Sequence, residues 1–403
     1  MKLKTDKKYS KSITSTNGKL HFSRYLLRPV GKESAQRLYE AEGVKAVAPL
    51  DCYLGIADLP FKMTVDAMLK VSYWAQNQCS YQRAEEALKS VMGVYINDDT
   101  VRLVANYIGG LVFKEDCRRA EESAEQLFSG KATFARKRKG VLYIEADGAA
   151  LNTRQKDNEG STWRENKLGI VFSSDNIYWW TDGKGDRQRQ LRKREYVSYI
   201  GSADEFRKHL AACAMRNGYG TYEETVVLGD GATWIRTMVE EYFPDAQQIL
   251  DYYHLCENVH EYARHYFKMD EARSKGWADR TCSALKKSQH ASVLEELRTH
   301  ETSHMSKCPV NLPGYIANNI NNIDYAAYEQ KGYFIGSGAI ESGNKIVLQQ
   351  RLKQAGMRWN VETAQNMLTL KSKAESSRWN SDVETYVLDL LCGKRRGAAI
   401  QAN

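Results

Sequence analysis

The sequence predicts a mixed α/β protein in which a helical region precedes a sheet-containing core, and an all-helical insertion interrupts that core. Within residues 140–256, short apolar stretches of strand length alternate with longer stretches that repeat apolar residues every three or four positions. The composition fits a folded protein, because 42% of the 403 residues are hydrophobic, 27% are charged and only 6 are proline. This length allows two or three domains, each with its own hydrophobic core.

The first region, residues 1–62, is predicted to be a basic arm with a small extended segment. Residues 1–46 contain eleven lysines and arginines but only four acids, so this stretch holds nearly all of the net charge of +8. Such a charge run is typical of a solvated, partly disordered arm, and it also suits an arm that contacts phosphates. Both interpretations can hold together.

Residues 63–139 are predicted to be a helical region and connector that contains a unit resembling a helix-turn-helix. Gly93 ends a first amphipathic helix, and Asp98 begins a second one. In a helix-turn-helix, the second helix would present Arg102 and Asn106 to the major groove of DNA. An ordinary helical hairpin gives the same pattern, so this alternative stays open.

The core, residues 140–256, is predicted from the order of its apolar stretches. An initial run of strands is followed by alternating helices and strands, which indicates a mixed sheet covered by helices. The strands are expected at 141–151, in two pieces within 167–180, at 196–201, at 225–231 and within 246–255, and the helices at 202–220, at 232–244 and after the last strand.

Two further segments complete the prediction. Residues 257–335 are charged, rich in helix formers and without strand alternation, so they are expected to form the helical insertion. Residues 336–403 are expected to complete the core, starting with a glycine-rich loop that enters a helix near Ala339. No window approaches 18 consecutive apolar residues, so we expect no membrane span and a cytoplasmic location. The eight scattered cysteines are expected to be reduced, mostly buried thiols.

Three carboxylates occupy places where an α/β sheet carries functional groups. Asp147 lies within the first strand, Asp230 at the end of a later strand, and Glu341 near the start of a helix. Ligands of open α/β sheets gather at the carboxyl ends of strands, so these distant residues can converge. Hard oxygen ligands without His or Cys suit Mg²⁺ or Mn²⁺, and two such ions support in-line displacement at a phosphodiester. RNase H-type nucleases and transposases have this arrangement.

Each acid also has an ordinary structural explanation. The Asp-Gly pairs at 147–148 and 230–231 are turn signals, and Glu341 could pair with Lys345 one helical turn later. Two such carboxylates could also act as acid and base on sugars without a metal. The order of strand, strand end and helix favours the metal site.

Four long stretches carry a resemblance to a known family: EADGAALNTR, STWRENKLGIVFSSD, LGDGATWIRTMVEEYFPDAQQILDYYHLCENV and GYFIGSGAIESGNKIVLQQRLKQAGMRWN. They resemble bacterial insertion-sequence transposases of the Lre type, which are related to Kra-type and more distantly to Mutator-like transposases. The resemblance implies an RNase H-like fold with a DDE triad and a helical insertion before the Glu. It also implies metal-dependent DNA cleavage and strand transfer at the ends of an insertion sequence.

Carried over residue by residue, the resemblance implies a catalytic triad that binds Mg²⁺ or Mn²⁺, as two ions, and consists of Asp147, Asp230 and Glu341. The segment from Asp251 to His254 resembles the D-x-x-H motif of the Mutator-like group, in which His254 would contact a phosphate or order the site. Glu145 lies on the same strand face as Asp147 and could be a ligand instead of Asp147 or in addition to it. Asp251 is the alternative to Asp230 as second acid.

Basic residues form two further clusters. The first lies in a predicted hairpin loop bordering the site and comprises Lys184, Arg187, Arg189, Arg192, Lys193 and Arg194. The second follows the predicted catalytic Glu and comprises Arg351, Lys353 and Arg358. Phosphate contacts supply sequence-independent affinity, so both clusters, together with Arg102, are predicted to bind DNA. A merely solvated loop is the alternative for the first cluster.

The expected partners are double-stranded DNA, both as element ends and as target, and further copies of the chain assembled on that DNA. No glycine-rich phosphate-binding loop is recognisable, so no nucleotide cofactor is expected. No membrane partner is expected, and bound DNA would place the protein at the nucleoid. The alternative from another class is a catalytically decayed or domesticated DNA-binding protein that keeps the transposase fold.

Overall fold

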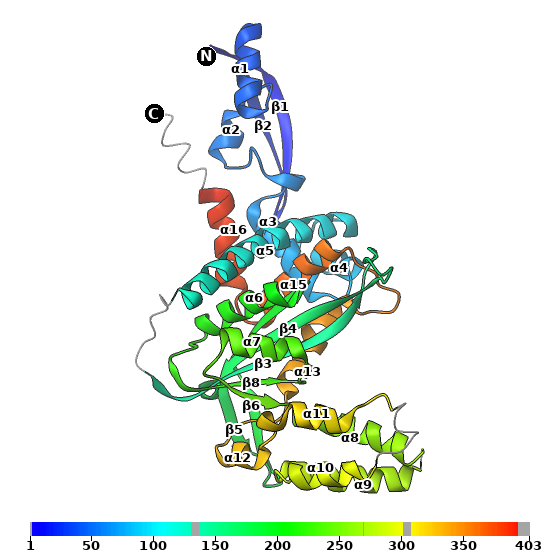
Figure 1. Ribbon diagram of the computed structural model, residues 1–403. Helices are drawn as coiled ribbons and strands as arrows, with labels where there is room; N and C mark the ends of the chain where they lie inside the picture. Colours follow the sequence, from blue (N-terminus) through cyan, green and yellow to red (C-terminus); the bar gives the residue numbers. More distant parts are fainter. Residues whose placement is uncertain (1, 130–136, 269, 301–307, 394–403) are drawn as a thin grey trace. The chain divides into compact units, whose positions relative to one another are not determined.

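The computed structural model describes residues 2–129, 137–268, 270–300 and 308–393 (Figure 1). The chain divides into two compact units, one formed by Met1–Glu115 with Gln350–Asn403 and the other by Asp116–Gln349. This division differs from the predicted one, because the helices after Gln350 group with the N-terminal helices and not with the sheet. Residues 130–136 of the predicted connector lie outside the described residues.

The first unit begins with an antiparallel two-stranded ribbon and two helices, namely β1 (Leu3–Ser15), β2 (Gly18–Pro29), α1 (Lys32–Glu42) and α2 (Pro49–Tyr53). The buried Asp51 of α2 accepts hydrogen bonds from Lys11 Nζ at 2.8 Å and Arg24 Nε at 2.9 Å. These charge-assisted bonds connect α2 to both strands. The basic N-terminal segment is therefore an ordered ribbon, and the prediction of a partly disordered arm is wrong.

Capping residues determine where the helices of the first unit begin and end. Thr64 and Ser80 each accept a backbone N–H three residues later, and Gly93 ends a helix in the left-handed conformation, with φ of 63°. A Cβ on Gly109 would lie 2.6 Å from the Asn366 carbonyl oxygen, so two helices pack backbone to backbone there. The helices are α3 (Val65–Asn77), α4 (Tyr81–Met92), α5 (Asp98–Phe128, of which residues 98–115 belong to this unit), α14 (Gln350–Leu352), α15 (Val361–Glu375) and α16 (Tyr386–Leu388), with π-helical turns at Trp379–Thr385 and Asp389–Gly393.

The second unit is built on a five-stranded mixed sheet. Its elements are β3 (Arg138–Asn152), β4 (Trp163–Ser173), β7 (Glu195–Ile200), α6 (Ala203–Arg216), β8 (Tyr222–Gly229), α7 (Thr233–Tyr242) and β9 (Gln247–Leu250). The strand order is β7-β4-β3-β8-β9, in which β4 is antiparallel to both neighbours and β3, β8 and β9 are parallel. Parallel neighbours need crossover connections, and α7 provides the one between β8 and β9.

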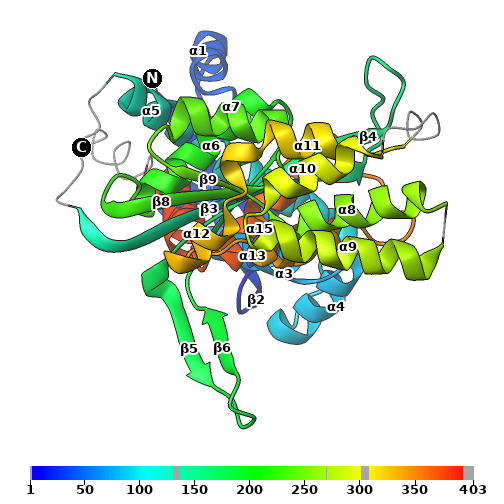
Figure 2. The same ribbon diagram turned by 60° about the horizontal axis from the view of Figure 1, so that its bottom comes forward.

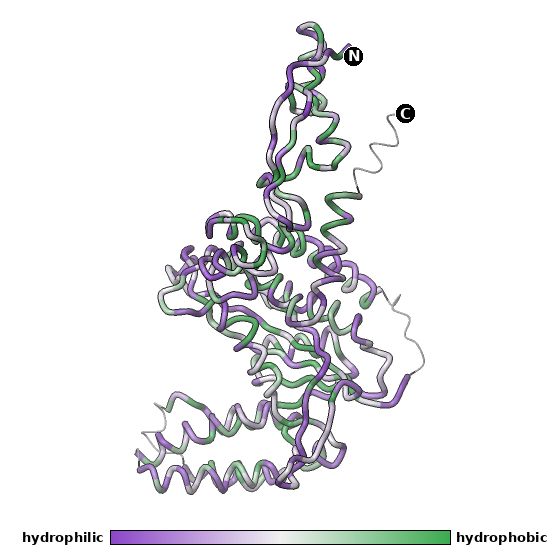
Figure 3. Tube along the Cα trace, turned by 180° about the vertical axis from the view of Figure 1, so that it is seen from behind, coloured by the Kyte–Doolittle hydropathy of each residue, from purple (hydrophilic) through white to green (hydrophobic). Residues whose placement is uncertain are grey.

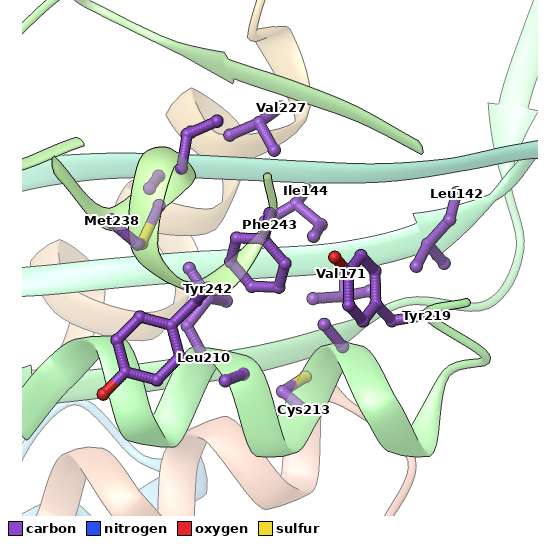
Figure 4. Close-up of a cluster of buried hydrophobic side chains, with 14 of the residues drawn as sticks. Leu142, Ile144, Val171, Leu210, Cys213, Tyr219, Val227, Met238, Tyr242 and Phe243 are labelled. Carbon is purple, nitrogen blue, oxygen red and sulfur yellow. The ribbon is translucent and has the colours of Figure 1, made fainter. Parts of the chain in front are cut away.

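The hydrophobic core of this unit lies between the sheet and the helices α6 and α7 (Figure 4). Ile144 of β3 packs there with Leu210 of α6 and Met238 of α7. Side chains alternate along a strand, so Glu145 and Asp147 project from the opposite face of the sheet. The packing of the apolar face thus decides which face carries the acids.

A second, separate hairpin leaves the sheet after β4 (Figure 2). A short turn at Ser174–Asn176 follows β4, and β5 (Ile177–Thr181) then pairs with β6 (Arg187–Leu191). The prediction of two strands around a Ser-Ser-Asp-Asn turn is confirmed, but the second strand joins a two-stranded sheet of its own.

Between β9 and Gln349, the described residues form helices and their connections, without a strand, as predicted for the insertion; residues 269 and 301–307 lie outside them. Along these helices, hydrophilic and hydrophobic residues alternate, as expected for helices with one buried face (Figure 3). They are α8 (Tyr252–Tyr266), α9 (Glu271–Lys286), α10 (His290–Arg298), α11 (Leu312–Asn318), α12 (Tyr325–Gln330) and α13 (Gly338–Gly343), the last continuing into a π-helical turn at Asn344–Gln349.

Two expectations concern the whole chain. Within the described residues, no helix is both long and apolar enough to cross a membrane. All eight cysteines lie within the described residues and none forms a disulfide, but only Cys213 and Cys282 are buried. The prediction that most of the thiols are buried is therefore wrong.

Candidate functional site

Asp147 and Asp230 lie side by side on adjacent strands. The strands β3 and β8 are parallel, and their register pairs Glu145 with Leu228. Two residues further along both strands, the same register places Asp147 level with Asp230, which follows the end of β8. Neighbouring strands are about 4.8 Å apart, so the two carboxylates meet at the carboxyl end of this parallel pair.

The surroundings of Asp147, including the neighbouring Asp230, disfavour the ionised form of its carboxyl group. Burial raises the pKa of the Asp147 carboxyl, and the charge of Asp230 raises it further. The backbone N–H of Gly148, at 2.7 Å, and the Asn344 side-chain amide, at 2.6 Å, donate to Asp147 and oppose this shift. A cation beside the pair would relieve the repulsion between the carboxylates.

Glu341 is exposed on the first turn of α13. Asn344, three residues later, donates to Asp147, and residues three apart lie on the same side of a helix. Glu341 therefore lies on the side of α13 that faces Asp147. Among the described residues, Glu341 forms no ion pair with Lys345, the partner in the alternative explanation. The structure thus places Asp147 beside Asp230, and it places Glu341 on a helix that is bonded to Asp147 through Asn344.

Glu145 anchors the helix that carries Glu341. Its carboxyl is only 1% exposed and accepts the backbone N–H of Ile340 at 2.8 Å. Burial is the main cause that raises the pKa of Glu145 to about 8. The first N–H groups of a helix lack partners within the helix, and Glu145 supplies one. This geometry favours an anchoring role over the alternative in which Glu145 binds a metal.

Asp251 ties the start of α8 to the start of α13. Its fully buried carboxylate accepts the backbone N–H groups of Tyr253, at 2.6 Å, and His254, at 2.9 Å, as the N-cap of α8. The other oxygen accepts the backbone N–H of Ser337 at 2.6 Å and the Ser337 hydroxyl. Because the carboxylate is saturated by these bonds, the structure favours Asp230 over Asp251 as the second acid.

His254 contributes a positive charge close to Asp147. Its Nδ1 lies 3.6 Å from Asp251 Oδ1, and this carboxylate raises the pKa of His254 to about 9. Burial by itself would raise the pKa of Asp251, but the bonds from His254 and Ser337 lower it to about 2. At neutral pH the pair is therefore imidazolium and carboxylate, and the imidazolium charge favours the ionised form of Asp147.

The sequence reasoning missed three residues that shape this site. Asn344 orients Asp147, and its own Oδ1 is buried without a hydrogen-bond partner. The backbone N–H of Ser337 donates a hydrogen bond to the Asp251 carboxylate, and the Tyr315 hydroxyl donates to the Asp230 carbonyl oxygen at 2.6 Å. The spacing of three residues between Glu341 and Asn344 was the one signal in the sequence that could have indicated Asn344.

Comparison with known families matches residues 64–384 to the uncharacterised protein family UPF0236. The chain belongs to this family. The matched range includes Asp147, Asp230, Glu341 and the Asp251 to His254 segment, whereas the β1–β2 ribbon lies outside it. No curated protein matches the sequence.

The acids of this UPF0236 protein are suited to a metal by their chemistry and do not form a closed ligand set. Among the described residues, no three His, Cys, Asp or Glu side chains come close enough to hold an ion. Asp147 and Asp230 nevertheless supply adjacent, partly buried carboxylates, which are the donors that Mg²⁺ and Mn²⁺ prefer. The residues present therefore fit a hard divalent ion.

The first basic cluster lies on the β5–β6 hairpin, with Lys184 in its turn and Arg187 and Arg189 on β6. Arg194 donates to the Tyr196 hydroxyl at 2.7 Å and to a carbonyl, so it holds the end of the hairpin. The root of the hairpin follows Ser173, which pairs with Leu142. That position is about 16 Å along β3 from Asp147. Contrary to the expectation, the root of the hairpin therefore does not border the acids.

The second basic cluster is only partly accessible. Arg351 is 1% exposed and donates to the Ala75 carbonyl oxygen at 2.9 Å, and its guanidinium stacks on Tyr81 and Trp359. The prediction that Arg351 binds DNA is therefore wrong, because this cation holds α14 to the end of α3. Lys353 and Arg358 are exposed and belong, like Arg351, to the first unit.

The segment predicted to resemble a helix-turn-helix forms two helices, α4, which ends before Gly93, and α5, which starts at Asp98, as either a helix-turn-helix or a helical hairpin would. Arg102 pairs with Asp99 at 3.2 Å on an exposed surface. Asn106 accepts a hydrogen bond from Asn366 of α15 at 2.9 Å. Asn106 is thus part of a helix contact within the unit, and the expectation that it faces a DNA groove is wrong.

Proposed function

We propose that this UPF0236 protein is a DDE transposase, which cleaves DNA at the ends of an insertion sequence and joins the freed strand to target DNA. The observation that carries the proposal is the meeting of Asp147 and Asp230 on adjacent parallel strands, with Glu341 on a helix bonded to Asp147 through Asn344. Three acids from a strand, a strand end and a helix could together hold two metal ions for phosphodiester displacement.

The topology of the second unit supports an RNase H-like core. Three antiparallel strands, β3, β4 and β7, followed by the parallel strands β8 and β9, would be the five strands of that core. The helices α8 to α12 lie between Asp230 and Glu341 in the chain, where such transposases carry a helical insertion.

In this proposal Asp147, Asp230 and Glu341 hold two Mg²⁺ or Mn²⁺ ions. When bound, such ions activate the attacking oxygen and stabilise the departing one. Asn344 orients the Asp147 carboxylate, while Glu145 and Asp251 hold the first turn of α13 and so position Glu341. The His254 imidazolium, held by Asp251, would attract a phosphate oxygen beside Asp147.

The partners in this proposal are double-stranded DNA, as element ends and as target, and further copies of the chain assembled on it. The exposed cations of the β5–β6 hairpin, together with Lys353, Arg358 and Arg102, would bind phosphates. No nucleotide cofactor enters the reaction, and DNA binding would hold the protein at the nucleoid.

A nicking assay with Asp147→Asn tests the proposal. The substrate is a duplex that carries the inverted repeat bracketing the coding region, and the reaction contains Mg²⁺. We expect the variant to lose strand cleavage and to keep its affinity for the duplex, because the amide retains the shape but not the charge. The matched control, Asp245→Asn, changes an exposed aspartate between α7 and β9 and should cleave normally. Cleavage by Asp147→Asn at the wild-type rate would refute the assignment.

A further inference from the structure

The β5–β6 hairpin exposes side chains that its own stability does not require. Four of the five residues of each strand are exposed, so neither face of this ribbon is fully packed. Tyr178, Trp179 and Trp180 are 45%, 40% and 39% exposed. An isolated two-stranded ribbon is marginally stable in water, and three consecutive exposed aromatic residues favour contact with a partner.

One face of the ribbon is attached to the rest of the unit. Arg189 lies on the same face as Trp179, its cross-strand partner, and stacks its guanidinium 4.1 Å from the Phe334 ring. Phe334 in turn stacks at 4.8 Å on Tyr143, a buried residue of β3. These contacts hold the ribbon against the unit by its Trp179 face, which leaves the Tyr178 and Trp180 face turned away.

The unattached face carries a continuous stack of flat groups. Tyr178 and Trp180 are two residues apart on one strand, so they share a face, and their rings stack at 5.9 Å with an interplanar angle of 22°. The Arg192 guanidinium covers the Tyr178 end of the stack, 3.8 Å from the Tyr178 ring. Trp180 therefore ends the stack with its ring partly exposed.

The charge of the hairpin indicates an anionic partner. Residues 177–194 carry six cations and only two acids, both aspartates. The next acid, Glu195 at the start of β7, is buried. Asp182 already accepts hydrogen bonds from the turn, including the backbone N–H of Lys184 at 2.9 Å. An arginine stacked on an aromatic ring keeps its N–H donors available for phosphate oxygens. Phosphates spaced along a strand, with flat bases between them, match this alternation of arginine and ring.

We propose that the β5–β6 hairpin binds unpaired bases of a DNA strand, with a base stacked on Trp180 and a phosphate bound by Arg192. Base pairs inside a duplex present their edges and not their faces, so stacking on an exposed ring selects bases that are unpaired. The inference rests on the proposed function, in which the strands at a cleaved end would supply such bases.

Fluorescence with the full-length chain tests this inference. The probes are a short single-stranded oligonucleotide containing one 2-aminopurine, its blunt-ended duplex, and heparin as a polyanion without bases. The double variant Tyr178→Ala with Trp180→Ala should bind the single strand about 10-fold or more weakly and lose the quenching of 2-aminopurine. Its affinity for heparin should stay unchanged, because the arginines remain. Tyr53→Ala, which removes the 88% exposed ring of α2, is the control for loss of a surface aromatic.

A second variant separates charge from stacking. Arg192→Gln should weaken binding of the single strand and of heparin alike, and it should reduce the dependence of binding on salt. Circular dichroism and the thermal midpoint check that both variants are folded.

Wild-type affinity and quenching in the aromatic double variant would overturn the inference. An equal loss of duplex and single-strand affinity in that folded variant would also overturn it, because stacking would then not select unpaired bases. Quenching by a wild-type protein that cleaves no DNA would contradict the proposed transposase activity and leave this inference standing. Cleavage of DNA by a wild-type protein that does not quench 2-aminopurine in the single strand would support the transposase activity and overturn this inference.

Discussion

At the carboxyl ends of β3, β8 and β9, acidic side chains are at least partly buried and accept hydrogen bonds from the backbone, whereas on the β5–β6 hairpin polar side chains are exposed and arginines stack on rings. Asp251 alone accepts bonds from Tyr253, His254 and Ser337. Arg192, by contrast, covers the exposed ring of Tyr178. The two regions belong to the same unit and differ in how strongly the rest of the chain determines their geometry.

This difference follows from what each region has to do in the proposed function. Displacement at a phosphodiester requires acids held within a fraction of an ångström, and a network of buried hydrogen bonds provides such rigidity. Stacking of bases on rings tolerates small shifts, because every base presents a flat face. We therefore expect perturbations of the acid edge to abolish chemistry and perturbations of the hairpin to weaken binding.

The largest expected effect comes from removing divalent ions. Addition of EDTA in excess should reduce cleavage of the end-containing duplex to background, because Asp147 and Asp230 then lack the ions they are proposed to hold. Quenching of 2-aminopurine by the hairpin should persist in the same solution. Restoring Mg²⁺ should restore cleavage. Undiminished cleavage in EDTA would show that neither region depends on divalent ions, which contradicts the proposed difference between them.

Asp251→Ala should produce the largest loss of stability. The substitution removes the N-cap of α8 and leaves the buried Ser337 N–H without its acceptor, which costs about 3 kcal/mol in free energy of unfolding. Urea denaturation measures the change, and Asp251→Asn, which keeps one oxygen, should lose less. Asp245→Ala, at an exposed site, should stay within about 0.5 kcal/mol of wild type. A similar value for Asp251→Ala would show that the buried network does not stabilise this region.

Asn344→Ala sharpens the comparison with a smaller effect. Loss of the bond to Asp147 should lower the rate of cleavage about 10- to 100-fold, while the free energy of unfolding falls by about 1 kcal/mol. The readouts are single-turnover cleavage and urea denaturation. Asn318→Ala, at an exposed end of α11, is the matched control and should change neither. Unchanged cleavage in Asn344→Ala would show that Asn344 does not contribute to the reaction and that only the carboxylates do.

Much of the secondary structure could be predicted, because its signals are local. Gly93 ends α4 where its left-handed conformation is needed, and Ser202 caps α6 by accepting the N–H of Glu205. Alternation of apolar residues indicated the strand that became β3, and with it the position of Asp147. Such signals depend on the residue and its neighbours in the chain, so the sequence displays them directly.

The errors arose where a residue's surroundings come from distant segments. Arg351 follows Glu341 in a basic stretch, yet it is buried by Tyr81 and Trp359 and bonded to the end of α3. The N-terminal segment looked like a solvated arm, yet Asp51 pairs with two of its cations. Charge patterns show that a residue is ionised and cannot show whether another element will cover it.

By itself, the sequence determined the types and order of the elements, the three acids and the basic hairpin, because periodicity, capping residues and composition act over a few neighbouring positions. Only the tertiary structure decided that Asp147 lies level with Asp230, that Glu145 and Asp251 anchor α13, and that Asn344 reaches Asp147. Those facts depend on strand register and on hydrogen bonds between segments up to 197 residues apart. Such pairings are fixed when the apolar face of the sheet is buried, which no local pattern records.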